Sequence, residues 1–310
     1  MNHPRPRLLL APTRNFLPFN PFSLDDEDAY RRWRDAKLTA QPRDIGNLIV
    51  EIRDPRKPRR IEIEALLRHC ATSNLAIWSG LGDAGRDKLV IRALGHQLGL
   101  ERLDHNPYAD DDAITSLRVK PAVMRQGYIP YSNRPLAWHT DGYYNRADKQ
   151  IGAVLLHCVQ PAAHGGENQV LDHEILYLLL RDENPDYLRA LMHPRAMTIP
   201  PNLADGKELR PARPGPVFSL RNGHLHMRYT DRERSIEWRD DPLTREAVAA
   251  LKAQLKTPSP WHYRIRLEAG QGLICNNVLH TRTRFEDGEP PRLLYRARYF
   301  DRIAAPPVSA

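Results

Sequence analysis

The chain has 310 residues, with 46 Lys or Arg against 38 Asp or Glu, so its formal net charge is +8, and hydrophobic residues make up 41% of it. A chain of this size and mixed composition buries a substantial core in one large or two ordinary domains, which excludes a disordered protein. No apolar run approaches the roughly 18 to 20 residues of a membrane span, and the three cysteines form no CxxC pair, so we expect a soluble cytoplasmic protein without a disulfide framework.

The first part of the chain predicts alternating helices and strands. Residues 1–44 are predicted to be an arm that carries one helix, because Ser23 is a capping residue and acidic residues follow it in the first turn. That helix is expected to reach about Lys37. Beyond it, the pattern predicts strands over 47–52 and 75–78 and helices over 62–70 and 86–98.

After residue 110 the pattern changes to short strands, most of them bounded by Gly, Pro or Asn. They are predicted over 114–119, 135–141, 151–158, 167–171, 216–220, 224–229, 261–267, 272–276 and 292–300. Helices are predicted over 172–182, 185–192 and 242–256, so a helical insert lies near 172–200. Many short strands with a few inserted helices indicate an α+β fold with a jelly-roll-like β core, in a single domain over residues 45–310.

His139 and Asp141 are the first candidates for chemistry. Residues i and i+2 of a strand face the same side, so this imidazole and this carboxylate can hold one metal ion. A chain with 13 His and 38 acidic residues also yields such a triplet by chance. A histidine beside a solvated aspartate is therefore the plainer interpretation of the motif taken alone.

His280 lies far downstream, after an apolar segment from Gly272 to Cys275. Two histidines and one carboxylate on a metal ion leave positions open, which is the arrangement of non-haem Fe(II) oxygenases. The open positions suit a bidentate 2-oxo acid together with O₂. A zinc hydrolase with the same three ligands is an alternative that this set of residues leaves open.

Arg292, Arg296 and Arg298 form the third candidate group, beginning 12 residues after His280. In a strand over 292–300 they share one face, and a guanidinium group binds a carboxylate through two parallel hydrogen bonds. An outward-facing arginine is the plainer interpretation of any one of them. Three arginines on one face nevertheless need anionic partners or solvent.

Four motifs follow one another along the chain. They are Trp138-His139-Thr140-Asp141, Gly165-Gly166-Glu167-Asn168, the segment from Asn277 to Phe285, and Arg292 with Arg296. In this order and spacing they resemble the taurine dioxygenase-like family (TauD/TfdA, clavaminate-synthase-like) of Fe(II)/2-oxoglutarate-dependent oxygenases. The resemblance spans roughly residues 45–300 and implies a double-stranded β-helix, or jelly roll, with helical insertions and N-terminal helices.

The resemblance also implies roles for single residues. His139, Asp141 and His280 would ligate Fe(II), and Arg292 would pair with the C5 carboxylate of 2-oxoglutarate, with O₂ as the second cosubstrate. In taurine-type members the second arginine of the motif contacts an anionic group of the substrate, which is Arg296 here. Other branches place the cosubstrate arginine later on this strand, so Arg296 or Arg298 is the alternative.

Asn168 departs from the family pattern, which often has Thr at this position to help bind 2-oxoglutarate. The amide of Asn168 is able to donate a similar hydrogen bond. Tyr143 follows the ligand strand, so it either lines the substrate pocket or only packs. Asp141 stands where halogenating relatives have a small residue, which favours hydroxylation or desaturation.

These features predict a dioxygenase that releases succinate and CO₂. Arg296 and Arg298 are the candidate substrate-binding residues and indicate a small anionic organic or amino acid as the substrate. A homo-oligomer is compatible with the sequence. Nucleic acid is disfavoured as a partner for two reasons. Most of the surplus positive charge lies in residues 1–60, which hold 13 cations and 8 acids, and no basic run is interleaved with aromatic residues. A non-catalytic module on the same fold that binds an anion or a nucleic acid is the alternative function.

Overall fold

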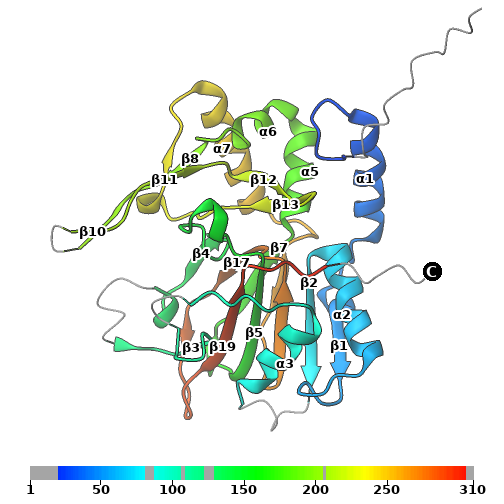
Figure 1. Cartoon of the computed structure of the whole chain (residues 1–310), viewed down its shortest axis with the longest axis vertical. Helices are drawn as coiled ribbons and strands as arrows, with labels where there is room; N and C mark the ends of the chain where they lie inside the picture. The colour runs from blue at the N-terminus through cyan, green and yellow to red at the C-terminus, as the bar shows by residue number, and fades with distance from the viewer. Residues whose placement is uncertain (1–19, 81–86, 106–108, 122–128, 205–206, 305–310) are drawn as a thin grey trace, which may run out of the picture.

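Two β-sheets form the centre of the computed structural model, which describes residues 20–80, 87–105, 109–121, 129–204 and 207–304 (Figure 1). The six-stranded sheet has the order β1 (Ile49–Ile52), β2 (Leu75–Gly80), β16 (Gln271–Cys275), β5 (Ala153–Gln160), β19 (Leu293–Tyr299) and β3 (Thr115–Leu117). The four-stranded sheet has the order β15 (Tyr263–Ile265), β7 (Asn168–Leu171), β17 (Leu279–Arg282) and β4 (Leu136–His139). Apart from the parallel pair β1–β2, neighbouring strands in both sheets are antiparallel.

The alternation of side chains along β5 shows how the six-stranded sheet is buried on both faces. Ala153 and Leu155 pack on one face against helices α2 (Arg60–Ser73) and α3 (Leu89–Gln97). Val154 and Cys158 point to the other face, where they join Val170 of the four-stranded sheet in one hydrophobic cluster. Because successive residues of a strand face opposite sides, one strand contributes to two cores, and the two sheets pack face to face.

A second layer of elements lies above the sheets in Figure 1. Its helices are α1 (Glu27–Ala40), α5 (His173–Glu183), α6 (Pro185–Leu191) and α7 (Pro242–Lys256). Its strands are β8 (Met197–Ile199), β9 (Asn202–Ala204), β10 (Lys207–Arg210), β11 (Arg213–Gly215), β12 (Phe218–Arg221), β13 (His224–Met227) and β14 (Glu237–Trp238). A third hydrophobic cluster joins these helices to β12 and β13.

Local sequence signals fix the ends of the inserted helices. Asp172 caps α5 by accepting from the backbone N–H of Glu174 at 2.9 Å, and Asp241 caps α7 by accepting from Thr244 N–H at 3.1 Å. Pro242 occupies the first turn of α7, where its missing N–H needs no partner. The predicted helix over 242–256 is confirmed at both ends.

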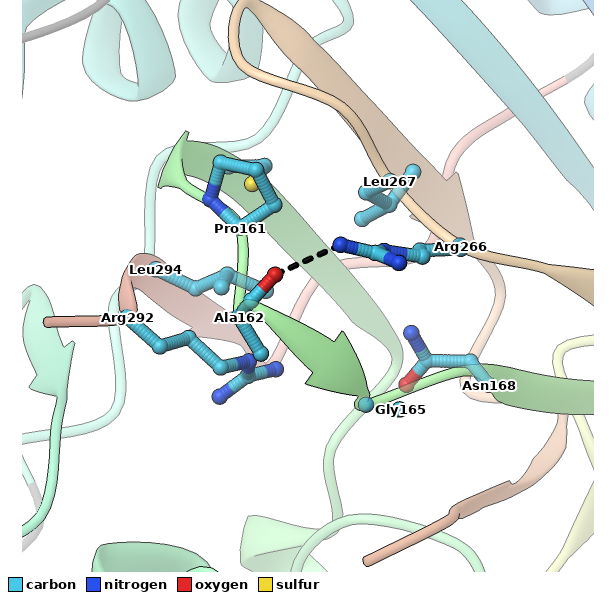
Figure 2. A pocket seen from close by; sticks show the side chains of 10 residues that line it. Pro161, Ala162, Gly165, Asn168, Arg266, Leu267, Arg292 and Leu294 are labelled. Atoms are coloured by element: carbon cyan, nitrogen blue, oxygen red, sulfur yellow. Dashed lines mark hydrogen bonds between the residues drawn. The ribbon is translucent and has the colours of Figure 1, made fainter. Parts of the chain in front are cut away.

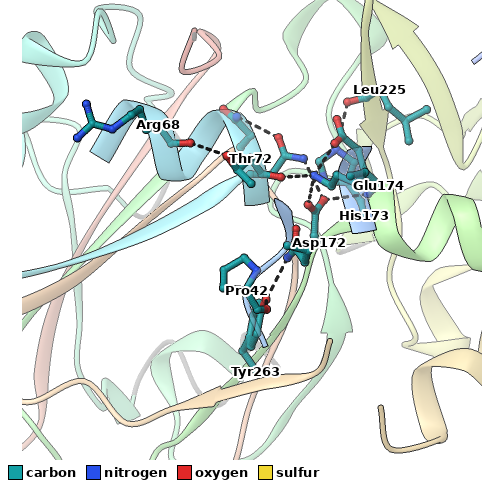
Figure 3. Close-up of polar contacts among 12 residues, drawn as sticks. Pro42, Arg68, Thr72, Asp172, His173, Glu174, Leu225 and Tyr263 are labelled. Atoms are coloured by element: carbon teal, nitrogen blue, oxygen red, sulfur yellow. Dashed lines mark hydrogen bonds and ion pairs between the residues drawn. The ribbon is translucent and has the colours of Figure 1, made fainter. Parts of the chain in front are cut away.

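Helix α1 is tied to α2 and to the start of α5 by a buried ion-pair network, shown in Figure 3. The Nζ of Lys37 lies 2.6 Å from Asp172 and 2.7 Å from Glu174, and it donates to the carbonyl of Thr72 at 2.6 Å. Burial alone would lower the pKa of Lys37, but the charges of Asp172 and Glu174 raise it. Residues near the start of the chain are therefore part of the folded body, while residues 1–19 of the predicted arm lie outside the described residues.

Most predicted strands occur within a few residues of the expected positions, and the combination of helices and sheets is confirmed. The strand β17, which carries His280, was not among the predicted strands. Its sequence Leu-His-Thr-Arg lacks the apolar alternation that marks a half-buried strand. The short pair β6 (His164–Gly165) and β18 (Phe285–Glu286) was not predicted either. None of the described helices is both long and apolar enough to cross a membrane.

Candidate active site

Two strands of the four-stranded sheet bring the predicted histidine ligands together. His139 ends β4 and His280 lies in β17, and the two residues are direct partners in the antiparallel pair. Their ring centroids are 4.2 Å apart. Because directly opposed residues project from the same face of a sheet, the register of β4 and β17 places two imidazoles from distant parts of the chain side by side.

Backbone contacts fix the orientation of both rings. The Nδ1 of His139 lies 2.9 Å from the carbonyl oxygen of Ala137, and the Nδ1 of His280 lies 3.0 Å from that of Val278. A carbonyl oxygen only accepts, so each Nδ1 carries the proton and each Nε2 keeps its lone pair. Burial, together with the charge of His280, lowers the pKa of His139 to about 3, so this ring is neutral at physiological pH. Both rings therefore present a nitrogen ligand.

Asn277 holds the backbone of Asp141 in place. Its side-chain oxygen accepts from the N–H of Asp141 at 2.8 Å, and its amide donates to the carbonyls of Asp141 at 3.0 Å and Ile151 at 2.9 Å. Asn277 itself adopts a left-handed backbone conformation with φ of 52°. It belongs to the motif around His280, but no local sequence signal predicts this positioning contact.

The carboxylate of Asp141 faces two arginines. Its Oδ1 accepts from Arg296 at 3.0 Å and lies 3.6 Å from the Nη1 of Arg298, whereas its Oδ2 is buried without a hydrogen-bond partner among the described residues. Burial alone would raise the pKa of Asp141, but the charges of Arg296 and Arg298 hold it well below its usual range. The carboxylate is therefore ionised.

The structure thus brings two of the three predicted ligands into close contact and turns the third toward the arginines. Within the described part of the chain, no three His, Cys, Asp or Glu side chains stand close enough together to hold a metal ion. The donor chemistry nevertheless fits Fe(II): two imidazoles whose Nδ1 atoms face backbone carbonyls, and an ionised carboxylate with one unpartnered oxygen.

The three arginines near the end of the chain are all buried but differ in their partners. Arg296 pairs with Asp141, while Arg298 pairs with Asp104 and donates to the hydroxyl of Tyr144 at 3.1 Å. Arg292 immediately precedes β19 and has no carboxylate partner for its side chain among the described residues. Its guanidinium lies 4.8 Å from the centroid of the Phe285 ring. Burial lowers the pKa of Arg292, so an anion brought to it would relieve its desolvation.

A pocket lies beside Arg292, shown in Figure 2. Its lining includes Gly165, Gly166, Asn168 and Arg266. Both glycines have positive φ, and a Cβ on Gly165 would meet the backbone oxygen of Arg284 at 2.1 Å, so only glycine fits there. The lining of the pocket therefore includes two arginines, one amide and the bare backbone of two glycines.

Strand β7 connects this pocket to the histidine pair. Its residue Val170 is the direct partner of His280, and Asn168 lies two residues earlier on the same face. At about 3.3 Å per strand residue, the two positions are roughly 7 Å apart along the strand. This separation is comparable to the length of a short dicarboxylate.

Tyr143 lies close to the histidine pair. Its hydroxyl is against the side chains of Ser235 and Thr230, and Thr230 forms a β-bridge with His139. The ring of Tyr143 packs edge-on against that of Tyr144, with centroids 5.3 Å apart. Burial raises the pKa of Tyr143, so its hydroxyl is neutral. The two tyrosines thus border the region of the proposed ligands.

A comparison with protein families identifies the class. Residues 36–298 match the family described as "Taurine catabolism dioxygenase TauD, TfdA family". The chain belongs to this family, which confirms the resemblance drawn from the four motifs. It is therefore a dioxygenase, an oxidoreductase that uses Fe(II), 2-oxoglutarate and O₂.

Two curated relatives share one name. The chain is 30% identical over 243 residues to a uridine-5'-phosphate dioxygenase from Amycolatopsis sp, covering 71% of this chain and 82% of the relative. It is 32% identical over 205 residues to a uridine-5'-phosphate dioxygenase from Streptomyces sp, covering 61% of this chain and 70% of the relative.

Solved structures show the same fold at low sequence identity. An asparagine oxygenase in complex with Fe(II), 2S,3S-3-hydroxyasparagine and succinate superposes with a TM-score of 0.55 at 17% identity, covering 77% of this chain and 78% of that one. The non-heme iron oxygenase OrfP in complex with Fe and alpha-ketoglutaric acid gives a TM-score of 0.57 at 16% identity, covering 76% and 79% of the two chains.

Proposed function

We propose that this chain hydroxylates a small phosphorylated substrate, with a nucleoside 5'-phosphate as the first candidate, on a double-stranded β-helix core. The observation that carries the proposal is the pair His139–His280, whose Nε2 atoms are both free, beside the ionised and half-unpartnered carboxylate of Asp141. The name shared by the two curated relatives supports the substrate class.

His139, Asp141 and His280 would hold the iron. The two imidazoles are already oriented by their backbone contacts, so little side-chain entropy is lost when they bind a metal ion. Asp141 would bind through Oδ2, which has no partner among the described residues, while Oδ1 stays with Arg296. Arg296 would thus hold the carboxylate of Asp141 through the oxygen that does not bind the metal.

Arg292 and Asn168 would bind the C5 carboxylate of 2-oxoglutarate. Arg292 is the arginine of the three whose guanidinium forms no ion pair with a described carboxylate, and it lines the same pocket as Asn168 (Figure 2). Arg296 and Arg298 are engaged with Asp141 and Asp104, which favours a positioning role for them over a role in binding 2-oxoglutarate or substrate.

Bound Fe(II) supplies the O₂ chemistry by which one oxygen atom enters succinate and the other enters the substrate, with release of CO₂. The overall balance is substrate C–H, O₂ and 2-oxoglutarate giving substrate C–OH, succinate and CO₂. The residues of the chain orient the dicarboxylate through Arg292 and exclude water with the buried walls of the site. Tyr143 would line the substrate side, beside Thr230 and His139.

The test is succinate formation by the purified full chain with and without Fe(II), comparing the wild type with His139→Ala and Asp141→Ala. We expect activity that requires Fe(II) in the wild type and is lost in both variants, and product of the mass of substrate plus one oxygen with uridine 5'-phosphate. Equal activity in all three proteins would refute the metal site. Replacing Fe(II) by Zn(II) is expected to abolish turnover, because zinc has no redox chemistry, whereas a zinc hydrolase would remain active.

A further inference from the structure

Arg210 and Arg213 lie in the inserted strands between α6 and α7 (Figure 1). Arg210 ends β10, and its guanidinium donates to the carbonyls of Pro200 at 2.6 Å and Pro211 at 2.9 Å. Arg213 begins β11, which pairs with β8 in antiparallel register. Arg210 is thus a half-buried side chain with a fixed position, held by backbone carbonyls rather than by an acid.

Neither arginine has a carboxylate partner among the described residues. The Nε of Arg213 is buried and has no hydrogen-bond partner there. Burial and the neighbouring charge of Arg213 lower the pKa of Arg210, and the phenol groups of Tyr143 and Tyr144 lie within reach of its charge. Two like charges in a partly desolvated place repel each other, and a bound anion removes that repulsion.

The two tyrosines connect these arginines to the proposed iron site. Tyr143 lies against Thr230, which forms a β-bridge with His139. Tyr144 accepts a hydrogen bond from Arg298 at 3.1 Å, and Arg298 in turn lies 3.6 Å from Asp141. Strand register places Arg210 near these tyrosines. Glu237 of β14 is the direct partner of Thr198 of β8, so Ser235, which contacts the hydroxyl of Tyr143, lies near Pro200, whose carbonyl accepts from Arg210.

The two arginines of β19 are already paired and are therefore not available to bind an anionic group of the substrate. Arg296 and Arg298 are neutralised by Asp141 and Asp104. The proposed function assigns Arg292 to 2-oxoglutarate. An anionic group on the substrate then needs cationic groups elsewhere around the site, and the uncompensated pair on the inserted strands meets that need.

We propose that Arg210 and Arg213 form the subsite for the phosphate group of the substrate, beside Tyr143 and Tyr144. This inference rests on the proposed function. A phosphate monoester carries a charge of about −1.5 to −2 at neutral pH and offers three acceptor oxygens, which matches two guanidinium groups and a phenol hydroxyl better than a singly charged carboxylate does.

The experiment compares each ligand with its counterpart that lacks the phosphate. Binding of uridine 5'-phosphate and uridine, and of ribose 5-phosphate and ribose, is measured by calorimetry on the full chain without added Fe(II) or 2-oxoglutarate. We expect the wild type to bind each phosphorylated ligand at least about tenfold more tightly than its counterpart. Arg210→Met and Arg213→Met should each reduce that ratio about tenfold or more, and Arg210→Lys should reduce it less.

Arg245→Met is the matched control, because Arg245 is an exposed arginine on α7 that pairs with Asp240. It is expected to keep the wild-type ratio. A wild type that does not prefer the phosphorylated ligands would overturn the proposal. Arg210 and Arg213 variants that keep the wild-type ratio would also overturn it. The same holds for variants that weaken binding of the phosphorylated ligand and of its counterpart equally, because a merely structural role gives that result. The proposed function is tested separately by Fe(II)-dependent succinate formation. Absence of succinate would refute that function without altering the binding ratios measured here.

Discussion

Replacing Arg292 with Met removes the guanidinium group that we assign to the C5 carboxylate of 2-oxoglutarate. Arg292 is 5% exposed, and its guanidinium forms no ion pair with a described carboxylate. Each charge-assisted hydrogen bond contributes about 1.5–3 kcal/mol, so losing a bidentate pair costs about 3–5 kcal/mol. At 1.4 kcal/mol per factor of ten, the dissociation constant of 2-oxoglutarate rises between about 100-fold and several thousandfold.

The assay is the KM for 2-oxoglutarate from succinate formation, with equilibrium binding of 2-oxoglutarate under anaerobic conditions as the second measurement. Arg292→Lys keeps the charge but loses the planar fork, so we expect an intermediate loss. Arg284→Met is the control, because Arg284 is an exposed arginine of the same segment. It should leave both constants unchanged.

An Arg292→Met variant that binds Fe(II) normally and keeps the wild-type KM for 2-oxoglutarate would refute the assignment. An Arg296→Met variant that raises that KM as much as Arg292→Met does would also refute the assignment. In that case the pairing of Arg296 with Asp141 would not prevent it from binding the cosubstrate, and the absence of an acidic partner would be a poor guide to function.

Arg296→Met should weaken Fe(II) binding about 10- to 100-fold in an anaerobic titration, because it removes the group that orients a metal-ligand carboxylate; unchanged Fe(II) affinity would contradict this role. Lys37→Met should lower the free energy of unfolding by about 3–5 kcal/mol in urea, since it leaves two buried carboxylates unpaired. Lys252→Met, which breaks a partly exposed pair of 3.6 Å, should cost at most about 1 kcal/mol, and equal losses would argue against the network. Gly165→Ala should lower the melting temperature and raise the KM for 2-oxoglutarate, because its Cβ would meet a backbone oxygen at 2.1 Å. Gly223→Ala has a similar positive φ but nothing within 4 Å, so a loss as large as that of Gly165→Ala would point to backbone strain rather than the clash.

The sequence predicted much of the local structure because the signals for it lie within a few residues of each other. Helix α7 begins at Pro242 after the cap Asp241, and the prediction placed both of its ends correctly. Strand β17 was not predicted because it lacks such a local signal. Its stability comes from pairing with β4 and β7 rather than from its own residues.

The candidate site divides in a similar way. The types of residue suited to binding iron, and the spacing of His139 and Asp141 along the chain, are properties of the sequence. The contact between His139 and His280, the hydrogen bonds from Asn277 and the orientation of both rings depend on strands that pair across more than a hundred residues. A local pattern contains no information about such partners.

Length, composition and ordered motifs were enough to determine the class of enzyme and the set of candidate side chains. Only the tertiary structure distinguished the buried arginines near the end of the chain, which look alike in sequence. Arg296 and Arg298 meet Asp141 and Asp104 through the fold, whereas the guanidinium of Arg292 forms no ion pair with a described carboxylate. The availability of a charge depends on what lies within a few ångströms of it, and folding decides that distance.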